Sequence, residues 1–361
     1  MDLEQEEMQF LGIFGIYKEA YKIIFSWKKI FSQITVALIL PLCFIFLAYI
    51  EVSDYLFQKI VIHEFELDGT RVDSAKYNKI SDLLSSELIA FWLLKLAYLV
   101  FTLIFSLLST SAVVYTIACI YTGREVTFKK VMSVVPRVWK RLMVTFLCIF
   151  VAVFAYNIFA LLILILWALC IGPVKIGILI LWVMFILYLV GLSYMSIIWQ
   201  LASVVSVLED LYGFRAMVKS RALIRGKLVV AIVIFLKLNI SLFVIKIAFE
   251  RLVVYGASLG MANRVGYGIL CFLLLFKLFL FGLVLQTIIY FVCKSYHHEN
   301  IDKSALSDHL EVYMGEYVPL KAKDIVIINE IVDMKLIPRI RIRKFFLFFH
   351  SMYCYDWTLL E

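Results

Sequence analysis

Four lysines lie within long apolar stretches of the chain, and their side chains are the clearest candidates for binding an anion. They are Lys95, Lys237, Lys246 and Lys277. The apolar stretches contain no aspartate or glutamate that could neutralise them. Lys95 and Lys246 are close enough to the ends of their stretches for the amines to reach an aqueous boundary, and Glu250 follows Lys246 by one helical turn. Lys237 and Lys277 are therefore the informative pair.

Lys237 and Lys277 occupy the middle of consecutive apolar stretches. If each stretch is a helix that crosses a bilayer, the two residues lie about 13 Å and about 12 Å from the start of their spans, at about 1.5 Å per residue. A charged lysine at such a depth costs about 2.5–3.5 kcal/mol. Loss of the proton, a long reach of the amine to the headgroups, or an anion from outside the chain would each offset this cost.

This pair suggests an inward-facing site for an anionic headgroup or a small solute. The polar residues that would assist it are Asn239, Asn157, Gln200 and Gln286. The alternative interpretation is that water, carbonyl groups and amides satisfy both lysines, which then serve only the packing of helices. The substitutions Lys237→Met and Lys277→Met would distinguish the two interpretations, because unchanged binding of lipid or solute in both variants would exclude an anion-binding site at these lysines.

A second group of basic residues lies in the 124–141 segment, which precedes an apolar stretch. On a helical wheel at about 100° per residue, one face of this segment is apolar and the opposite face is basic. The basic residues are Lys129, Lys130, Arg137, Lys140 and Arg141. Such a helix is expected at the headgroup plane of a membrane that contains anionic lipid, with a bend at Pro136. Alternatively, the helix packs on protein and only positions the spans.

Two other segments are also basic. The 10–29 segment sorts its aromatic and aliphatic residues opposite Lys18, Lys22 and Lys29, so it is predicted to be a second two-faced helix. The 209–227 segment is basic but is not sorted into two faces.

The composition identifies the class of protein that must position these residues. The chain has 361 residues, of which 64% are hydrophobic and 17% are charged, whereas an ordinary globular protein is roughly 45–50% apolar. This composition excludes soluble, disordered and disulfide-scaffold classes. The net charge of +8 is spread between apolar stretches, which favours anionic membrane lipids as partners and not nucleic acid.

Six stretches are long enough to cross a bilayer as helices. They are 30–50, 88–122, 142–171, 176–208, 228–249 and 269–293. We therefore expect an all-α, polytopic membrane protein with six transmembrane helices and short basic cytosolic connecting helices. Its parts would be a cytosolic amphipathic N-terminal helix (1–29), a six-span membrane domain (30–293) and a cytosolic C-terminal tail (294–361).

The orientation follows from lysine and arginine. The N-terminus and the 123–141 and 209–227 connections carry more of these residues than the 51–87 connection and the other two loops. Basic segments remain on the cytosolic side, so both termini should be cytosolic and the acidic 51–87 loop should face the lumen or exterior. The endomembrane system or the plasma membrane is the default location.

The basic connections also repeat. Residues 128–144 align with 214–230, and a weaker copy lies at 15–31. This pattern predicts three units, each a short basic helix followed by two spans.

Motifs that support catalysis or cofactor binding are missing from the sequence. There is no phosphate-binding loop, nucleophile elbow or His-Glu-x-x-His pair. Cys293, His297 and His298 lie close together but lack a second pair of metal ligands. We expect no catalytic residue, cofactor or metal, and hence no enzyme. The leading function is a non-enzymatic membrane protein that binds or organises anionic lipid, and the alternative is a transporter of a small anion or lipid headgroup.

Four segments resemble an uncharacterised family of plant six-span membrane proteins. They are residues 7–20 (EMQFLGIFGIYKEA), 121–128 (YTGREVTF), 213–227 (GFRAMVKSRALIRGK) and 309–320 (HLEVYMGEYVPL). The second and third are also remotely similar to the membrane domain of some bacterial glycerophosphodiester phosphodiesterases, whose catalytic barrel this chain lacks. The resemblance implies no activity and no site residues. Whether residues after about 335, with their short apolar run, belong to the native fold stays open.

Overall fold

The computed structural model describes residues 8–70, 74–124, 126–170, 175–256 and 260–297. Within these residues the regular secondary structure is helical and includes no strand, which confirms the all-α prediction. The described helices all belong to one compact unit, Met1–Glu316. Beyond His297 the predicted tail lies outside the described residues, so its apolar run stays a prediction.

Six helical rods are long and apolar enough to cross a membrane, as expected of a multi-pass membrane protein. The first consists of α3 (Lys28–Ile34), the π-helical segment η1 (Thr35–Ile39) and α4 (Leu40–Asp68), and the others are α5 (Ala75–Tyr121), α6 (Phe128–Cys170), α7 (Lys175–Leu208), α9 (Leu228–Phe249) with η2 (Glu250–Val254), and α10 (Met261–Tyr296). Two shorter helices, α2 (Ile13–Ser26) and α8 (Phe214–Leu223), belong to the basic connections. The prediction of six spans is therefore confirmed at the level of length and composition.

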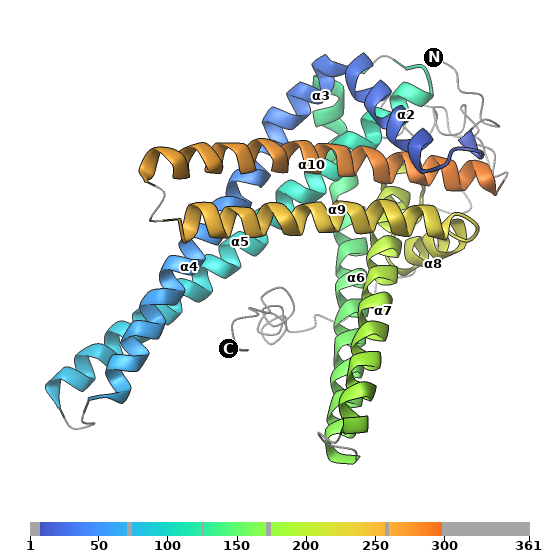
Figure 1. Ribbon diagram of the computed structural model, residues 1–361. Coiled ribbons are helices and arrows are strands. Elements are labelled where there is room, and N and C mark those ends of the chain that lie inside the picture. The colour runs from blue at the N-terminus through green and yellow to red at the C-terminus, as the bar shows by residue number, and fades with distance from the viewer. Residues whose placement is uncertain (1–7, 71–73, 125, 171–174, 257–259, 298–361) are drawn as a thin grey trace, which may run out of the picture. The chain divides into compact units, whose positions relative to one another are not determined.

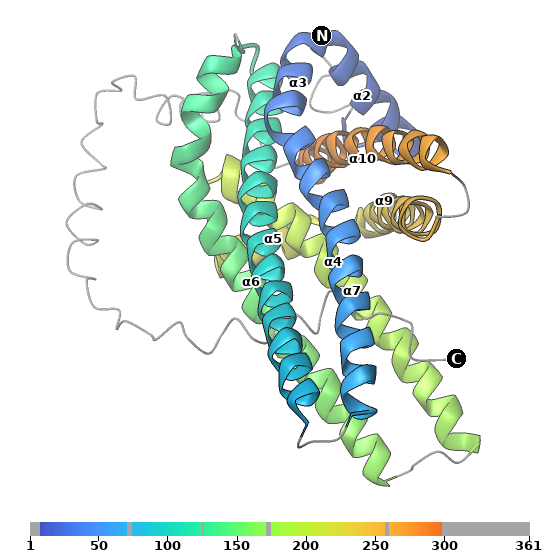
Figure 2. The same cartoon turned by 90° about the vertical axis from the view of Figure 1, so that its left-hand side faces the viewer.

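The rods form three pairs of neighbouring antiparallel helices: α4 with α5, α6 with α7, and α9 with α10 (Figures 1 and 2). In the first pair the rings of Tyr49 and Tyr98 stack with centroids 3.9 Å apart. In the second, the Tyr188 hydroxyl donates a hydrogen bond to Asn157 Oδ1 over 2.9 Å. The third pair runs across the α6–α7 pair in Figure 1, and Figure 2 shows it foreshortened.

Two boundaries differ from the sequence-based prediction. The predicted 51–87 loop is mostly helix, because α4 continues to Asp68 and α5 already begins at Ala75. The Ser74 hydroxyl caps α5 by accepting a hydrogen bond from the Tyr77 N–H over 3.1 Å. The 124–141 segment is likewise no separate connecting helix, because α6 runs through Pro136 into the span.

The best-packed part of the structure lies where one end of each pair meets α2 and α8. Here residues 112–119 of α5, 284–293 of α10 and nearly all of 201–208 of α7 are buried. We call this region the packed end. Helix α10 contacts α2, α5, α7 and α8, so apolar side chains at the packed end are covered by protein.

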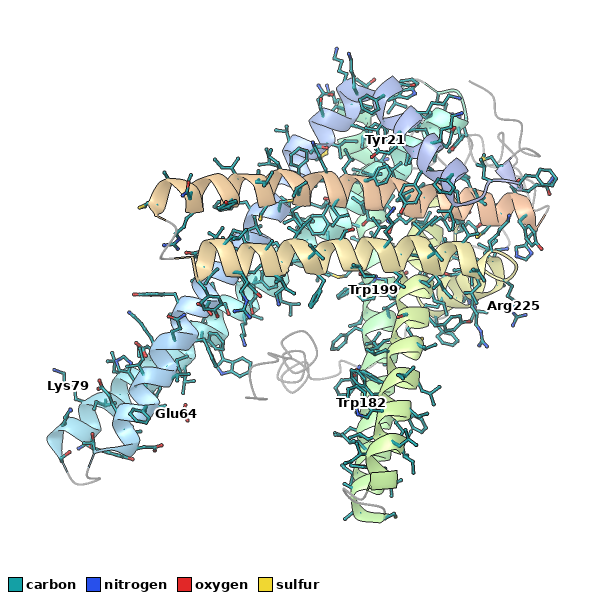
Figure 3. The ribbon with its side chains drawn as sticks, in the orientation of Figure 1. Tyr21, Glu64, Lys79, Trp182, Trp199 and Arg225 are labelled. Carbon is teal, nitrogen blue, oxygen red and sulfur yellow. The ribbon has the colours of Figure 1, made fainter. Side chains whose placement is uncertain are left out.

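The outer halves of α6 and α7 are different, because many of their apolar side chains remain exposed. Helix α7 carries exposed Leu179, Trp182 and Leu187, and α6 carries exposed Phe159 and Leu166. Figure 3 shows Trp182 on this outer half of α7, whereas Trp199 lies on the part that approaches α9. Exposed apolar surface on this scale is typical of helices that contact lipid.

Candidate functional site

The predicted two-faced segment forms the first turns of α6. Val131, Val135, Val138 and Leu142 are buried on one face, as the helical wheel predicted. Four of the five predicted basic residues are exposed. They are Lys129, Lys130, Arg137 and Lys140, and we call them the basic face. The structure therefore confirms the sorting of this segment into two faces, and leaves its proposed lipid contact as a prediction.

The fifth basic residue, Arg141, has a different place. Its Nη1 atom lies 2.7 Å from Asp210 Oδ1 in the loop between α7 and α8. One turn further along α6, the Thr145 hydroxyl accepts a hydrogen bond from the Gly213 N–H over 2.8 Å. Gly213 has a φ of +65°, a conformation that favours glycine. Arg141 therefore helps to hold this loop against α6.

A half-buried polar contact ties the same loop to α10. The Tyr290 hydroxyl donates to Glu209 Oε1 over 2.6 Å, and Lys294 Nζ lies 3.0 Å from the same oxygen. Sequence reasoning missed this contact. Glu209 and Asp210 are the only acids in the basic 209–227 segment. Two adjacent acids among so many basic residues were the sequence feature that could have indicated an ion pair here.

Hydrogen bonds hold both α8 and the residues that follow it against neighbouring helices. The Ser220 hydroxyl donates to the Ile198 carbonyl of α7 over 2.9 Å. His297 Nε2 lies 3.0 Å from the Leu223 carbonyl and 2.9 Å from that of Arg225, so this nitrogen must carry the hydrogen because carbonyl oxygens only accept. His297 thus serves as an anchor for the chain after α8. Among the described residues, no group of three His, Cys, Asp or Glu side chains could hold a metal ion.

The intramembrane lysines predicted from the sequence are both exposed, Lys237 on α9 and Lys277 on α10. Leu238 lies against Gly282, so in this antiparallel pair the two lysines are offset by about 9 Å along the helix axes, at about 1.5 Å per residue. Neither amine has a carboxylate partner among the described residues. Their predicted role in binding an anion stays a prediction.

The polar residues expected to assist these lysines are engaged in other ways or lie elsewhere. The Asn239 amide donates to the Phe235 carbonyl of its own helix over 3.0 Å, and Asn157 belongs to the α6–α7 pair through Tyr188. Gln286 is buried within α10, and Gln200 is half-buried on α7. The structure therefore offers no common cluster of these side chains with both lysines.

Lys237 instead contacts the N-terminal helix. Its Nζ atom lies 5.1 Å from the ring centroid of Tyr17 on α2. The ring centroids of Tyr17 and Tyr21 lie 5.5 Å and 4.8 Å from that of Phe281 on α10. Figure 3 marks the position of Tyr21 on α2. Burial raises the pKa of the Tyr17 hydroxyl, and the neighbouring Tyr21 adds to this rise. Nothing in the sequence pointed to this contact, since the two segments are far apart along the chain.

Six long apolar helical rods place the chain in the class of multi-pass helical membrane proteins. Residues 1–329 match the family described as "Domain of unknown function (DUF8558)", and the chain belongs to that family. No curated protein and no solved structure matches it. The family description assigns no activity, so the resemblances to plant six-span proteins and to a bacterial membrane domain stay predictions.

Proposed function

We propose that this protein is a non-enzymatic integral membrane protein that binds anionic lipid through the basic face of α6. The observation that carries this proposal is the position of Lys129, Lys130, Arg137 and Lys140, which are exposed on a helix whose opposite face is buried. Both termini and the basic face would be cytosolic, in the endomembrane system or the plasma membrane.

The physical basis is the attraction between clustered cations and a negative membrane surface. Each lysine or arginine near an anionic leaflet contributes about 1 kcal/mol. The attraction is screened over about 8–10 Å at physiological salt, so the cations must lie close to the headgroups. The continuity of α6 supports a position of the cations close to the headgroups, because the basic face belongs to the same continuous helix as the apolar span. Arg141 forms an ion pair with Asp210 and is therefore not included in the basic face.

The test is lipid retention by the purified full-length protein in nanodiscs of phosphatidylcholine with phosphatidylserine, measured by native mass spectrometry. Lys129→Gln with Lys130→Gln should weaken retention of phosphatidylserine by about thirtyfold, because two of the cations are removed. The matched control is Lys76→Gln with Lys79→Gln, since both of these lysines are exposed on α5 at the far end of the α4–α5 pair. Figure 3 marks the position of Lys79.

The control pair should retain phosphatidylserine as the unmodified protein does. Equal losses from the two pairs would mean that any exposed lysine suffices, and would contradict a specific role for the basic face. Loss of phosphatidylcholine in parallel would contradict the proposed preference for anionic lipid.

A further inference from the structure

Helix α2 has an exposed aromatic stripe, of which Tyr21 also packs against Phe281 of α10. The exposed fractions of Phe14, Phe25 and Tyr21 are 90%, 71% and 53%, and helical periodicity places these residues on one face. Ile16 and Ile23, on the opposite face, are fully buried. The stripe is therefore available to a partner while the other face holds α2 on the rest of the protein.

Charge indicates which partner fits this stripe. Lys18 and Lys22 are exposed along its border, and Lys28 and Lys29 are exposed just beyond the helix. The only acid between residues 10 and 29, Glu19, is buried. Exposed aromatic rings edged by lysines match the boundary between acyl chains and anionic headgroups, where rings enter the apolar side and amines reach phosphates. The occupant that this surface fits is an anionic lipid leaflet.

The same helix lies beside the two exposed lysines of the third pair. Lys237 is in contact with Tyr17, and Lys277 lies one helical turn before Phe281, against which Tyr17 and Tyr21 pack. Because α2 carries exposed lysines on the neighbouring turns, it cannot lie in the hydrocarbon core without a large penalty. Whatever layer of the bilayer holds α2 must therefore also be near Lys237 and Lys277.

Counting residues from the end of a span does not measure the depth of these lysines. Such a count assumes that α9 and α10 stand along the membrane normal. The third pair runs across α6 and α7 in Figure 1, so all three pairs cannot share one such direction. The contacts of α2 are the better guide to depth, because they depend on charge and exposure and not on helix tilt.

We infer that α2 lies in the headgroup layer of an anionic leaflet and that Lys237 and Lys277 bind lipid phosphates in that same layer. This inference rests on the proposed function only in taking anionic lipid as the ligand. It names a second site, formed by α2, α9 and α10, that is separate from the basic face of α6. It also explains how two lysines in apolar stretches can remain charged without a carboxylate partner.

The first test measures phosphatidic acid bound to the purified protein from phosphatidylcholine nanodiscs that contain it, by native mass spectrometry. Lys237→Met with Lys277→Met should weaken retention by about thirtyfold. Lys246→Met, on the same helix as Lys237, should have no effect, because its amine lies 3.4 Å from Glu250. Full retention by the double variant would overturn the inference. Lys129→Gln with Lys130→Gln is measured in parallel to distinguish the two sites. The proposal for α6 fails only if this variant has no effect, and the inference for α2, α9 and α10 fails only if Lys237→Met with Lys277→Met has none.

The second test measures depth directly. Spin labels are attached to Phe14→Cys on α2 or Leu187→Cys on the outer half of α7, after Cys148, Cys170 and Cys354 are replaced by serine. Both labelled positions are exposed. Accessibility to oxygen and to a water-soluble nickel complex should place the label at 14 in the headgroup layer and the label at 187 among the acyl chains. A label at 14 that lies as deep as the one at 187, or in bulk water, would overturn the inference. Water exposure with concentration-dependent spin–spin coupling would point to a second copy of the chain.

Discussion

The packed end and the outer halves of the same helices have similar apolar composition but opposite surroundings. On α7, Leu201 is fully buried by other helices, whereas Leu187 is 64% exposed. The two leucines cannot be distinguished by hydropathy, because protein and lipid accept apolar side chains equally well. The comparison shows that a hydropathy profile locates membrane helices while leaving open which of their parts build the protein core.

The polar contacts of the two regions also differ. At the packed end, Glu209, Tyr290 and Lys294 join a loop to α10 and so connect separate pairs. In the outer halves, contacts such as His63 Nδ1 to Glu87 Oε2, 2.7 Å apart, join two helices of one pair. The packed end therefore joins the α6–α7 pair to α10, whereas the α4–α5 and α9–α10 pairs also meet further out, where Arg264 Nη2 lies 3.5 Å from Glu51 Oε1.

The largest expected effect comes from truncating one leucine in each region. Leu201→Ala should lower the free energy of unfolding in mixed detergent micelles by about 2–5 kcal/mol, because it opens a cavity among buried neighbours. Leu187→Ala should change it by less than about 0.5 kcal/mol, because detergent covers that side chain in both states. Unfolding by sodium dodecyl sulfate, followed by circular dichroism, measures both. Similar losses for the two variants would remove the distinction between the regions.

A smaller effect is expected from the adjacent acids of the α7–α8 loop. Glu209→Ala should destabilise the protein by about 2 kcal/mol, because Lys294 and the Tyr290 hydroxyl lose a partner that is only 15% exposed. Asp210→Ala should cost about 0.5 kcal/mol, since Asp210 is 72% exposed in its pair with Arg141. The same unfolding measurement ranks the two, and a larger loss for Asp210→Ala would contradict the assembly role given to Glu209.

The smallest difference within a pair of variants is expected for two glycines with positive φ. Gly213→Ala should cost about 1–2 kcal/mol, because its φ is +65° and the new Cβ would lie 3.3 Å from Cys148 Sγ. Gly123→Ala has a similar φ of +70° but meets no atom within 4 Å, so it should cost less. The difference in unfolding free energy between the variants isolates the packing contribution at the packed end. Equal losses of unfolding free energy would mean that backbone strain alone accounts for the effect of both substitutions.

Much of the fold could be predicted because it depends on local sequence. Length and hydropathy are sufficient for six helical rods, and helical periodicity is sufficient for the buried and basic faces of α6. The prediction of a loop over 51–87 was wrong, because its acidic residues were taken as a sign of irregular structure. The Ser74 hydroxyl instead caps α5, which begins well before the apolar part of that helix. Pro136 did not end α6, since its neighbours still form helix around it.

The candidate sites were harder to predict because they depend on contacts between distant segments. The packing of Tyr17 and Tyr21 on Phe281 joins residues near opposite ends of the described chain. The depth assigned to Lys237 rested on helix direction, which hydropathy does not contain. The engagement of Arg141 by Asp210 is likewise invisible on a helical wheel.

The most direct test of the central claim, that the basic segments share one side of a membrane opposite the α4–α5 connection, is labelling in sealed vesicles. Lys22→Cys, Lys130→Cys and Lys76→Cys are exposed sites, introduced singly after Cys148, Cys170 and Cys354 are replaced by serine. A membrane-impermeant maleimide should label positions 22 and 130 from one side and position 76 only from the other. Labelling of 22 and 130 from opposite sides, or of 76 together with both, would contradict the account.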